Sequence, residues 1–312
     1  MKICVTTPVK PHHQQWLEAA AGIHTVCYDR NGLDQAEIII GDLGPEELAA
    51  AQNLQWFHLV WAGADRYKQT DFPAHARFTN GSGAYGVMIA EHMMACMLSM
   101  VRQLPHYAQN QKDHRWDKDW AEDTLEGKTV LILGAGDIGT QLAKRLRGFD
   151  CRIIGLRRTM ADAPYFDESH TLEALDEQLP QADIVACALP GTAATKGLLN
   201  KQRLLSMKPG ALLLNCGRGS LIVTDDLEEV LAMGHLGGVA LDVTDPEPLP
   251  AHSPLWDDPK VILTPHISGA SFGHVVQTED KIYRLAAENL RRFLSGESLL
   301  NEVDFETGYR KR

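Results

Sequence analysis

Three segments of the sequence place an ionisable side chain directly after an apolar, strand-like run. In "ILTPHISG" (262–269) a proline ends the run, because proline lacks a backbone donor and favours extended geometry in the residue before it, and His266 follows. "LLLNCGRGS" sets Arg218 between two glycines, and "VALDVTDPEPLP" carries Asp242 and then Glu247. Arginine can bind a carboxylate bidentately and polarise a carbonyl, and a histidine beside a carboxylate can donate a proton. The three segments predict acid catalysis on a substrate that carries a carboxylate.

A lone histidine in a loop would more often be an ordinary solvated side chain. Here Glu247 precedes His266 by 19 positions and one strand, so a contact between the two side chains is plausible. A carboxylate at that place favours the imidazolium form of the histidine, which is the form that donates a proton.

Six apolar runs between residues 129 and 265 provide the frame for these residues. Amphipathic segments such as "GTQLAKRLRGF" and "TLEALDEQL" separate them. Near-continuous apolar strands that alternate with helices indicate a parallel sheet covered on both faces, and six of them fit an α/β, doubly wound, Rossmann-type fold. In such a sheet ligands bind at the carboxyl ends of the strands. The runs are 129–134, 151–156, 183–189, 211–217, 238–243 and 260–265.

The first hundred residues show a second, looser α/β pattern, with the strand-like runs "KICVTT", "TVCYD", "AEIIIGD" and "LQWFHLV". A long helical stretch over about 85–112 connects the two halves, and the last helical run, 279–296, is expected to return to the first domain. The predicted domains are 1–99 for the first part of a substrate-binding domain, 100–280 for the nucleotide-binding domain and 281–312 for the return.

The segment "LILGAGDIG" places Gly134, Gly136 and Gly139 at G-x-G-x-x-G spacing, directly after a strand and before a helix. In this context the spacing predicts a dinucleotide site, with glycines for the tight turn, for the approach to the pyrophosphate and for close helix–strand packing. The helix N-terminus, which begins with Asp137 and Ile138, supplies amide donors to the phosphates.

The second strand ends in Arg157 and Arg158, followed by Thr159, where an NAD site normally has an acidic residue. Two guanidinium groups suit a 2′-phosphate, although arginines at strand ends are often simply exposed. We therefore expect NADP(H) to be favoured, with NAD(H) possible. A nicotinamide above the sheet would face an arginine, a carboxylate and a histidine, as hydride transfer to a keto acid requires.

The segments "LILGAGDIG", "LPGTAATKGLLN", "LLLNCGRGSLIVTDDL", "GGVALDVTDPEPLP" and "VILTPHISG" together resemble the D-isomer-specific 2-hydroxyacid dehydrogenase family. The ending "NEVDFETGY" is similar to the family's C-terminal stretch. Chain length and the arginines after the second strand most resemble the glyoxylate/hydroxypyruvate reductase branch. The resemblance implies a nucleotide domain inserted into a flavodoxin-like substrate domain, a homodimer, and NAD(P)H-dependent reduction of small 2-keto acids to D-2-hydroxy acids.

The resemblance also implies a role for each matching residue. Arg218 corresponds to the arginine that binds the substrate carboxylate and carbonyl, His266 to the catalytic histidine and Glu247 to the acid that supports it. Asp242 corresponds to the residue that orients the nicotinamide amide. Four further positions are implied to contact the cofactor together with His266, namely Leu189, Pro190, Thr195 and Cys216. Backbone amides in "WAGADRY" are implied to hold the substrate carboxylate, at Ala62, Gly63 and Ala64, and Trp61 departs from the small or polar residue expected beside them.

Composition and charge exclude several other classes of protein. The formal charge of -11 over 312 residues argues against a nucleic-acid partner, and the longest apolar stretch is interrupted by Glu91 and His92, which argues against a membrane span. The N-terminal residues lack the apolar core of a signal peptide, and the six cysteines are scattered like buried thiols, so we expect a cytoplasmic protein. His12-His13 has no third ligand nearby in the sequence, so no metal is expected.

The sequence leaves several alternative interpretations open. A cofactor-sensing corepressor would share the fold, and loss of a catalytic residue would favour it, but Arg218, Glu247 and His266 are all present. Formate dehydrogenase also shares the fold and has a glutamine where Glu247 stands. The polar segment 111–123, with two tryptophans, is either a solvated loop or a subunit contact. Cys216 has no base at a suitable spacing, so a packing thiol is favoured over a nucleophile.

Overall fold

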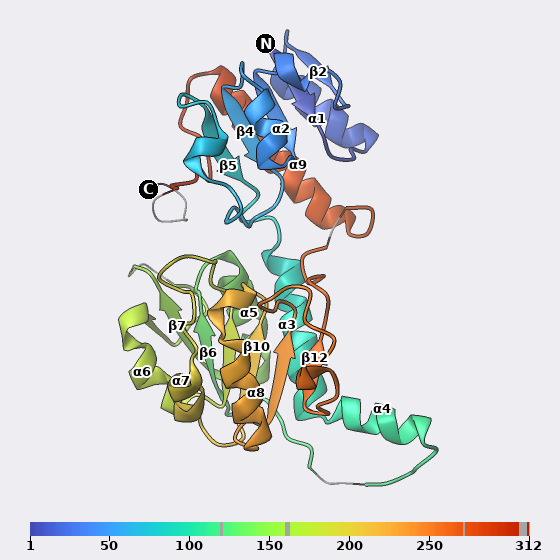
Figure 1. Ribbon diagram of the computed structural model, residues 1–312, viewed down its shortest axis with the longest axis vertical. Coiled ribbons are helices and arrows are strands. Elements are labelled where there is room, and N and C mark those ends of the chain that lie inside the picture. The colour runs from blue at the N-terminus through green and yellow to red at the C-terminus, as the bar shows by residue number, and fades with distance from the viewer. Residues whose placement is uncertain (119–120, 160–162, 271, 306–310, 312) are drawn as a thin grey trace. The chain divides into compact units, whose positions relative to one another are not determined.

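Seven parallel strands form the larger of two sheets in the computed structural model, which describes residues 1–312 except 119–120, 160–162, 271, 306–310 and 312 (Figure 1). Their order is β12-β11-β10-β9-β6-β7-β8, the doubly wound order in which the chain starts in the middle and builds outward in both directions. The strands are β6 (Thr129–Leu133), β7 (Arg152–Arg157), β8 (Glu168–Thr171), β9 (Ile184–Cys187), β10 (Leu212–Asn215), β11 (Gly238–Leu241) and β12 (Val261–Leu263).

Six of these strands confirm the predicted runs, and β8 is an additional edge strand. Its sequence, "ESHT", has no apolar residue and all four positions are only half-buried, so no hydrophobic pattern marks it. The central strands are almost entirely buried, as expected for a parallel sheet with helices on both faces.

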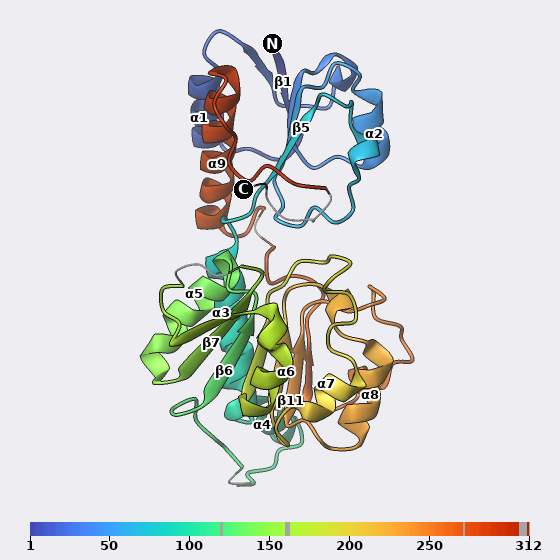
Figure 2. The same cartoon turned by 90° about the vertical axis from the view of Figure 1, so that its left-hand side faces the viewer.

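Helices cover both faces of this sheet, with α3 and α5 on one side and α6, α7 and α8 on the other (Figure 2). The bounds are α3 (Gly86–Val101), α4 (Leu104–Lys112), α5 (Asp137–Leu146), α6 (Leu175–Gln178), α7 (Lys201–Ser206) and α8 (Thr224–Ala232). The single helix expected over 85–112 is therefore two helices. Gln103 adopts a left-handed φ of 53° between them, because Pro105 lacks an amide donor and its ring would clash with the carbonyl of Val101.

The second sheet has five parallel strands in the order β2-β1-β3-β4-β5, which is the flavodoxin-like order. The strands are β1 (Lys2–Val5), β2 (Thr25–Cys27), β3 (Ile38–Gly41), β4 (Trp56–Leu59) and β5 (Arg77–Asn80). The helices α1 (Pro11–Ala21) and α9 (Val276–Leu294) lie side by side on one face, and α2 (Pro45–Ala50) covers the other (Figure 2).

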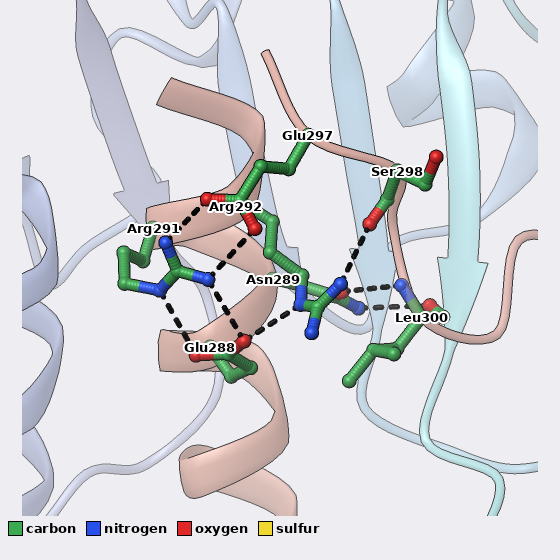
Figure 3. Close-up of polar contacts among 7 residues, drawn as sticks. All are labelled: Glu288, Asn289, Arg291, Arg292, Glu297, Ser298 and Leu300. Carbon is green, nitrogen blue, oxygen red and sulfur yellow. Dashed lines mark hydrogen bonds and ion pairs between the residues drawn. The ribbon is translucent and has the colours of Figure 1, made fainter. Parts of the chain in front are cut away.

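The last helix belongs to the same unit as the first helix. The Tyr283 hydroxyl of α9 donates to the carbonyl of Pro8 at 2.7 Å, and α9 packs along α1. The last part of the chain thus packs in the same unit as its first part. The buried side chain of Asn289 in α9 bonds both the N–H and the C=O of Leu300, which follows the helix (Figure 3). Ion pairs of Glu288 and Glu297 with Arg291 and Arg292 lie beside these bonds.

The chain divides into two units. We call 86–269 the inserted unit and 1–85 with 270–312 the flanking unit. The boundaries expected after residues 99 and 280 lie further along the chain than these. The first differs because α3 packs against α5 and β10, and the second because the start of α9 packs against α1.

Three sequence expectations concern features of the whole chain. No helix among the described residues is long and apolar enough to cross a membrane. All six cysteines are free thiols, and five of them are buried. The expected cytoplasmic location stays a prediction. Parts of two segments singled out in the sequence, residues 119–120 of the polar segment and 306–309 of the C-terminal stretch, lie outside the described residues.

One buried histidine makes the stability of the flanking unit depend on pH. The ring of His58 in β4 is fully buried, and its Nδ1 lies 2.7 Å from the Thr79 hydroxyl, which also accepts from the Trp56 indole. Complete burial lowers the pKa of His58 to about 3, because the charged ring loses its hydration. The unfolded chain therefore binds one more proton than the folded chain between about pH 6.5 and pH 3.

We expect the free energy of unfolding to fall as the pH is lowered through this window, by about 1.4 kcal/mol per pH unit from His58. His58→Asn keeps an acceptor for Thr79 and does not titrate, so this contribution should vanish from the slope. Urea denaturation of both proteins between pH 7 and pH 5 measures the difference. Parallel slopes for the two proteins would contradict the assignment.

Candidate active site

The glycine turn between β6 and α5 has the geometry that the sequence pattern predicts. Gly134 has a φ of 109°, and a Cβ there would lie 2.7 Å from the carbonyl oxygen of Ala188. A Cβ on Gly139 would lie 2.2 Å from the carbonyl oxygen of Gly134. Gly136 is the N-cap residue of α5, and nothing lies within 4 Å of the position of its Cβ. The first and last glycines are required by packing, and the middle one leaves open space at a helix N-terminus, a position suited to an anion.

Asp137 begins α5, and its carboxylate accepts the backbone N–H of Gly86 at 2.9 Å. The side chain thus bonds the first residue of α3, so the amides of the first turn of α5 are the groups of this segment suited to a phosphate. Ile138 follows in this turn and is half-buried.

The end of β7 lies beside the glycine turn. The carbonyl of Leu156 accepts the N–H groups of both Gly134 and Ala135, each at 2.9 Å. Arg157, half-buried, and Arg158, exposed, come directly after Leu156, and Thr159 follows. Both arginines therefore stand where the ribose of a dinucleotide lies in a doubly wound fold.

The loop after β9 is held by its own side chains. The hydroxyl of Thr195 is buried, accepts the N–H of Thr192 at 2.9 Å and donates to the carbonyl of Pro190 at 2.7 Å. Leu189 is buried, and a Cβ on Gly217 would lie 2.5 Å from its carbonyl oxygen. These contacts give Thr195 a structural role in shaping the loop, and its contact with a cofactor stays a prediction.

Arg218 is held at the carboxyl end of β10 by a buried asparagine that the sequence reasoning overlooked. The side chain of Asn215 donates to the carbonyl of Arg218 at 2.9 Å and accepts the N–H of Gly217 at 3.0 Å. The guanidinium donates to the carbonyl of Gly217 at 2.8 Å, and a Cβ on Gly219 would lie 1.9 Å from the carbonyl oxygen of Thr244. These hydrogen bonds and the close packing at Gly219 therefore fix the backbone conformation around Arg218.

Cys216 lies two residues before Arg218 and is buried. Burial raises the pKa of its thiol well above the usual value, so it stays protonated near neutral pH. The interpretation of Cys216 as a packing thiol fits this environment.

The predicted contact between His266 and Glu247 is present. His266 Nδ1 lies 2.7 Å from Glu247 Oε1, and the two side chains remain 47% and 43% exposed, so a substrate can reach the opposite edge of the ring. His266 has a left-handed φ of 53°, which non-glycine residues adopt only when their surroundings hold them there. Its N–H donates to the carbonyl of Asp242 at 2.8 Å.

Asp242 holds the loop that carries His266. Its buried carboxylate accepts the Thr264 hydroxyl at 2.7 Å and the N–H groups of Ile267 and Ser268, each at 2.9 Å. Burial alone would raise the pKa of Asp242, but the bonds from Ser268, Thr264 and Ile267 lower it below its ordinary value. The carboxylate is therefore an ionised acceptor that bonds the chain on both sides of His266. Its expected contact with a nicotinamide amide stays a prediction.

The loop predicted to hold the substrate carboxylate follows β4 in the flanking unit. Its carbonyls are occupied: Trp61 accepts from Gly81 N–H at 2.9 Å, and Ala62 accepts from the Asn80 side chain at 2.7 Å. The Trp61 ring stacks on Tyr85 with ring centroids 6.1 Å apart, and the edge of Phe272 lies against it at 5.1 Å. Trp61 is thus accommodated in an aromatic cluster, and Gly63 and Ala64 follow it, half-buried.

The structure brings a third potential metal ligand to His12 and His13 that spacing in the sequence did not indicate. The Nε2 atoms of both rings lie 2.8 and 2.9 Å from Oδ1 of Asp280 in α9. His13 Nδ1, however, accepts the backbone N–H of Lys10 at 3.2 Å, so the proton of a neutral ring is on Nε2. A metal at Nε2 would require loss of this cap bond, because the ligating nitrogen must be unprotonated. The geometry favours a hydrogen-bonded link between α1 and α9, and the absence of a metal stays a prediction.

A doubly wound sheet with this glycine turn, and with an arginine and a His–Glu pair at its carboxyl edge, defines the class of nicotinamide dinucleotide-dependent α/β oxidoreductases. Residues 94–268 match the family described as D-isomer specific 2-hydroxyacid dehydrogenase, NAD binding domain. The protein belongs to the D-isomer specific 2-hydroxyacid dehydrogenase family.

Relatives within the family carry different names. The chain is 37% identical over 223 residues to glyoxylate/hydroxypyruvate reductase B of Pectobacterium carotovorum, covering 69% of this chain and 68% of that one. It is 32% identical over 315 residues to a formate dehydrogenase of Chaetomium thermophilum, covering 91% and 83%. A crystal structure of a D-isomer specific 2-hydroxyacid dehydrogenase from Xanthobacter autotrophicus Py2, in complex with NADPH and MES, is 28% identical, covers 99% of each chain and has a TM-score of 0.83.

Proposed function

We propose that the protein reduces small 2-keto acids, of the glyoxylate and hydroxypyruvate type, to D-2-hydroxy acids. The observation that carries this proposal is the 2.7 Å contact between His266 and Glu247 at the carboxyl edge of the sheet. Arg218 stands at the same edge, one strand beyond Asp242. The relatives named as glyoxylate/hydroxypyruvate reductases support the choice of substrate class.

Arg218, His266 and Glu247 have different roles in this reaction. When bound, the nicotinamide nucleotide supplies the hydride that reaches the carbonyl carbon. Arg218 binds the substrate carboxylate through parallel hydrogen bonds and polarises the carbonyl, and His266 gives its proton to the carbonyl oxygen as the hydroxyl forms. Glu247 contacts Nδ1 of His266 and orients the ring. The role of the backbone amides of Ala62, Gly63 and Ala64 in substrate binding stays a prediction.

A substrate screen tests the proposal. Glyoxylate, hydroxypyruvate, pyruvate, phenylpyruvate and branched 2-keto acids are each offered with NADH and with NADPH, and nicotinamide absorbance is followed. Reduction of the smallest keto acids is expected to be fastest. A protein that oxidised formate and reduced none of these acids would overturn the proposal.

The two other interpretations have less support. Formate dehydrogenases are relatives of this chain, but Glu247 stands where we expect their glutamine, and it contacts His266. A corepressor-like binding protein has no need of an intact Arg218, Glu247 and His266 at one sheet edge.

We also propose that NADPH is preferred over NADH, because Arg157 and Arg158 follow β7 where an acid would bind the ribose hydroxyls of NAD. Two charge-assisted bonds to a 2′-phosphate, weakened by exposure to solvent, should favour NADPH by about ten- to a hundredfold in kcat/KM. Added salt should erode the preference because it screens exposed charges.

The test compares kcat/KM for NADPH and NADH in the wild type and in Arg157→Ala/Arg158→Ala. The matched control is Arg152→Ala at the opposite end of the same strand, where Arg152 pairs with Glu168. The control should leave the ratio unchanged. A wild type that prefers NADH, or a double variant with the wild-type ratio, would rule out the phosphate contact without touching the dehydrogenase assignment.

We propose in addition that the protein is a homodimer through the segment that follows α3. The helix α4 extends away from the sheet (Figure 1). Leu104, its first residue, and Trp116, four residues after its end, are 53% and 93% exposed. A partner chain that covered this segment would bury both side chains. Sedimentation of the wild type and of Trp116→Ala measures the mass in solution.

A further inference from the structure

The loop that carries His266 is bonded to a side chain of α3 that no part of the proposed mechanism uses. Thr264, two residues before His266, places its hydroxyl 2.7 Å from Asp242 Oδ1 and 3.3 Å from Nε2 of His92. His92 lies in α3, 172 positions earlier in the chain, and its Nε2 is also 3.6 Å from the sulfur of Cys96, one helical turn on. All of these residues belong to the inserted unit.

The proton positions in this chain of contacts follow from the ionised state of Asp242. A carboxylate only accepts, so the Thr264 hydroxyl donates its single proton to Oδ1. The Thr264 oxygen can then only accept from His92, so His92 carries its proton on Nε2. His92 is therefore a donor that fixes the direction of the Thr264 hydroxyl.

Thr264 and Ile267 share one oxygen of Asp242, and Ser268 bonds the other. Asp242 thus bonds the chain before His266, at Thr264, and after it, at Ile267 and Ser268. The left-handed backbone of His266 must be maintained by such contacts. If the Thr264 hydroxyl turned away, the first of these contacts would be lost and the imidazole would be free to move relative to the carbonyl of a substrate.

We propose that His92 is a positioning residue for His266, acting through Thr264 and Asp242. The proposal rests on the proposed function of His266 as the proton donor. His92 itself does not touch substrate or cofactor in this assignment. The Nε2–H group of His92 donates to the Thr264 oxygen and so keeps the loop that carries His266 in its reactive geometry.

The test uses three variants of the full chain. His92→Leu removes the donor, His92→Gln restores an N–H group near the position of Nε2, and Thr264→Val removes the hydroxyl that His92 contacts. We expect His92→Leu to lower kcat for keto-acid reduction about tenfold, because a small displacement of a catalytic group is costly, while both KM values change less than about twofold. His92→Gln should recover most of the rate.

A double variant separates positioning from general damage. Because His92 and Thr264 act through one bond, His92→Leu in the Thr264→Val background should cause no further loss of kcat. Glu91→Gln, the neighbouring residue on α3 that pairs with Arg145, is the control and should retain the wild-type rate. Equal losses in His92→Leu and His92→Gln, or additive losses in the double variant, would overturn the proposal.

Amide hydrogen exchange gives a reading that does not depend on catalysis. The N–H groups of Ile267 and Ser268, which bond Asp242, should exchange about tenfold faster in His92→Leu than in the wild type and at the wild-type rate in His92→Gln. Unchanged exchange together with unchanged kcat in His92→Leu would overturn the inference. A wild type that reduces no keto acid would overturn the proposed function instead, and the exchange data alone would then decide whether His92 braces the loop.

Discussion

Replacement of His266 by glutamine is expected to lower kcat for keto-acid reduction by about 10²- to 10⁴-fold. Glutamine can still hydrogen-bond Glu247 across the 2.7 Å contact, but it has no proton to give to the forming alkoxide. Cofactor affinity should stay close to that of the wild type. Initial rates and cofactor titration by nicotinamide fluorescence measure the two quantities. A variant with the wild-type kcat would remove His266 from the mechanism.

The contact between Glu247 and His266 orients the imidazole that donates the proton. Glu247→Gln is therefore expected to lower kcat for keto-acid reduction, which initial rates measure. An unchanged kcat in Glu247→Gln would show that the contact has no part in proton transfer.

The second large effect is expected at Arg218. A planar guanidinium binds a carboxylate in two parallel hydrogen bonds and polarises the ketone at the same time, which the point charge of lysine cannot reproduce. Arg218→Lys should raise KM for the keto acid and lower kcat, with a loss in kcat/KM of about 10²- to 10³-fold.

Cofactor affinity should remain nearly unchanged in Arg218→Lys. Arg152→Lys, at the amino end of β7, makes the same chemical change at the opposite edge of the sheet and serves as the control. Loss of cofactor binding with an unchanged KM for the keto acid would contradict the role given to Arg218.

Much of the inserted unit could be predicted from local patterns. The buried strands of a parallel sheet are apolar along their whole length, so runs such as "TVLILG" are visible in the sequence. Gly134 and Gly139 were predictable from the spacing of the glycine motif, because only a residue without a Cβ fits against Ala188 and against the turn itself. Strand β8 was not predictable in this way, because a polar edge strand has no apolar pattern.

The helix break at Gln103 shows a signal that was present but overlooked. Pro105 cannot continue a helix that includes Val101, and this local signal limits the helix that the apolar pattern of 86–101 indicates. The domain boundaries needed the structure, because whether α3 belongs to one unit or the other depends on what it packs against and not on its own sequence.

The sequence by itself determined the class of fold, the dinucleotide turn and the residue types at the carboxyl edge, because each is encoded within a few neighbouring residues. The tertiary structure alone decided which distant side chains meet. Asp280 contacts His12 and His13 only because α9 packs along α1. His92 contacts Thr264 only because α3 packs against the sheet of the inserted unit. No spacing in the sequence records such contacts, since they depend on how complete elements pack, and packing joins residues without regard to their separation along the chain.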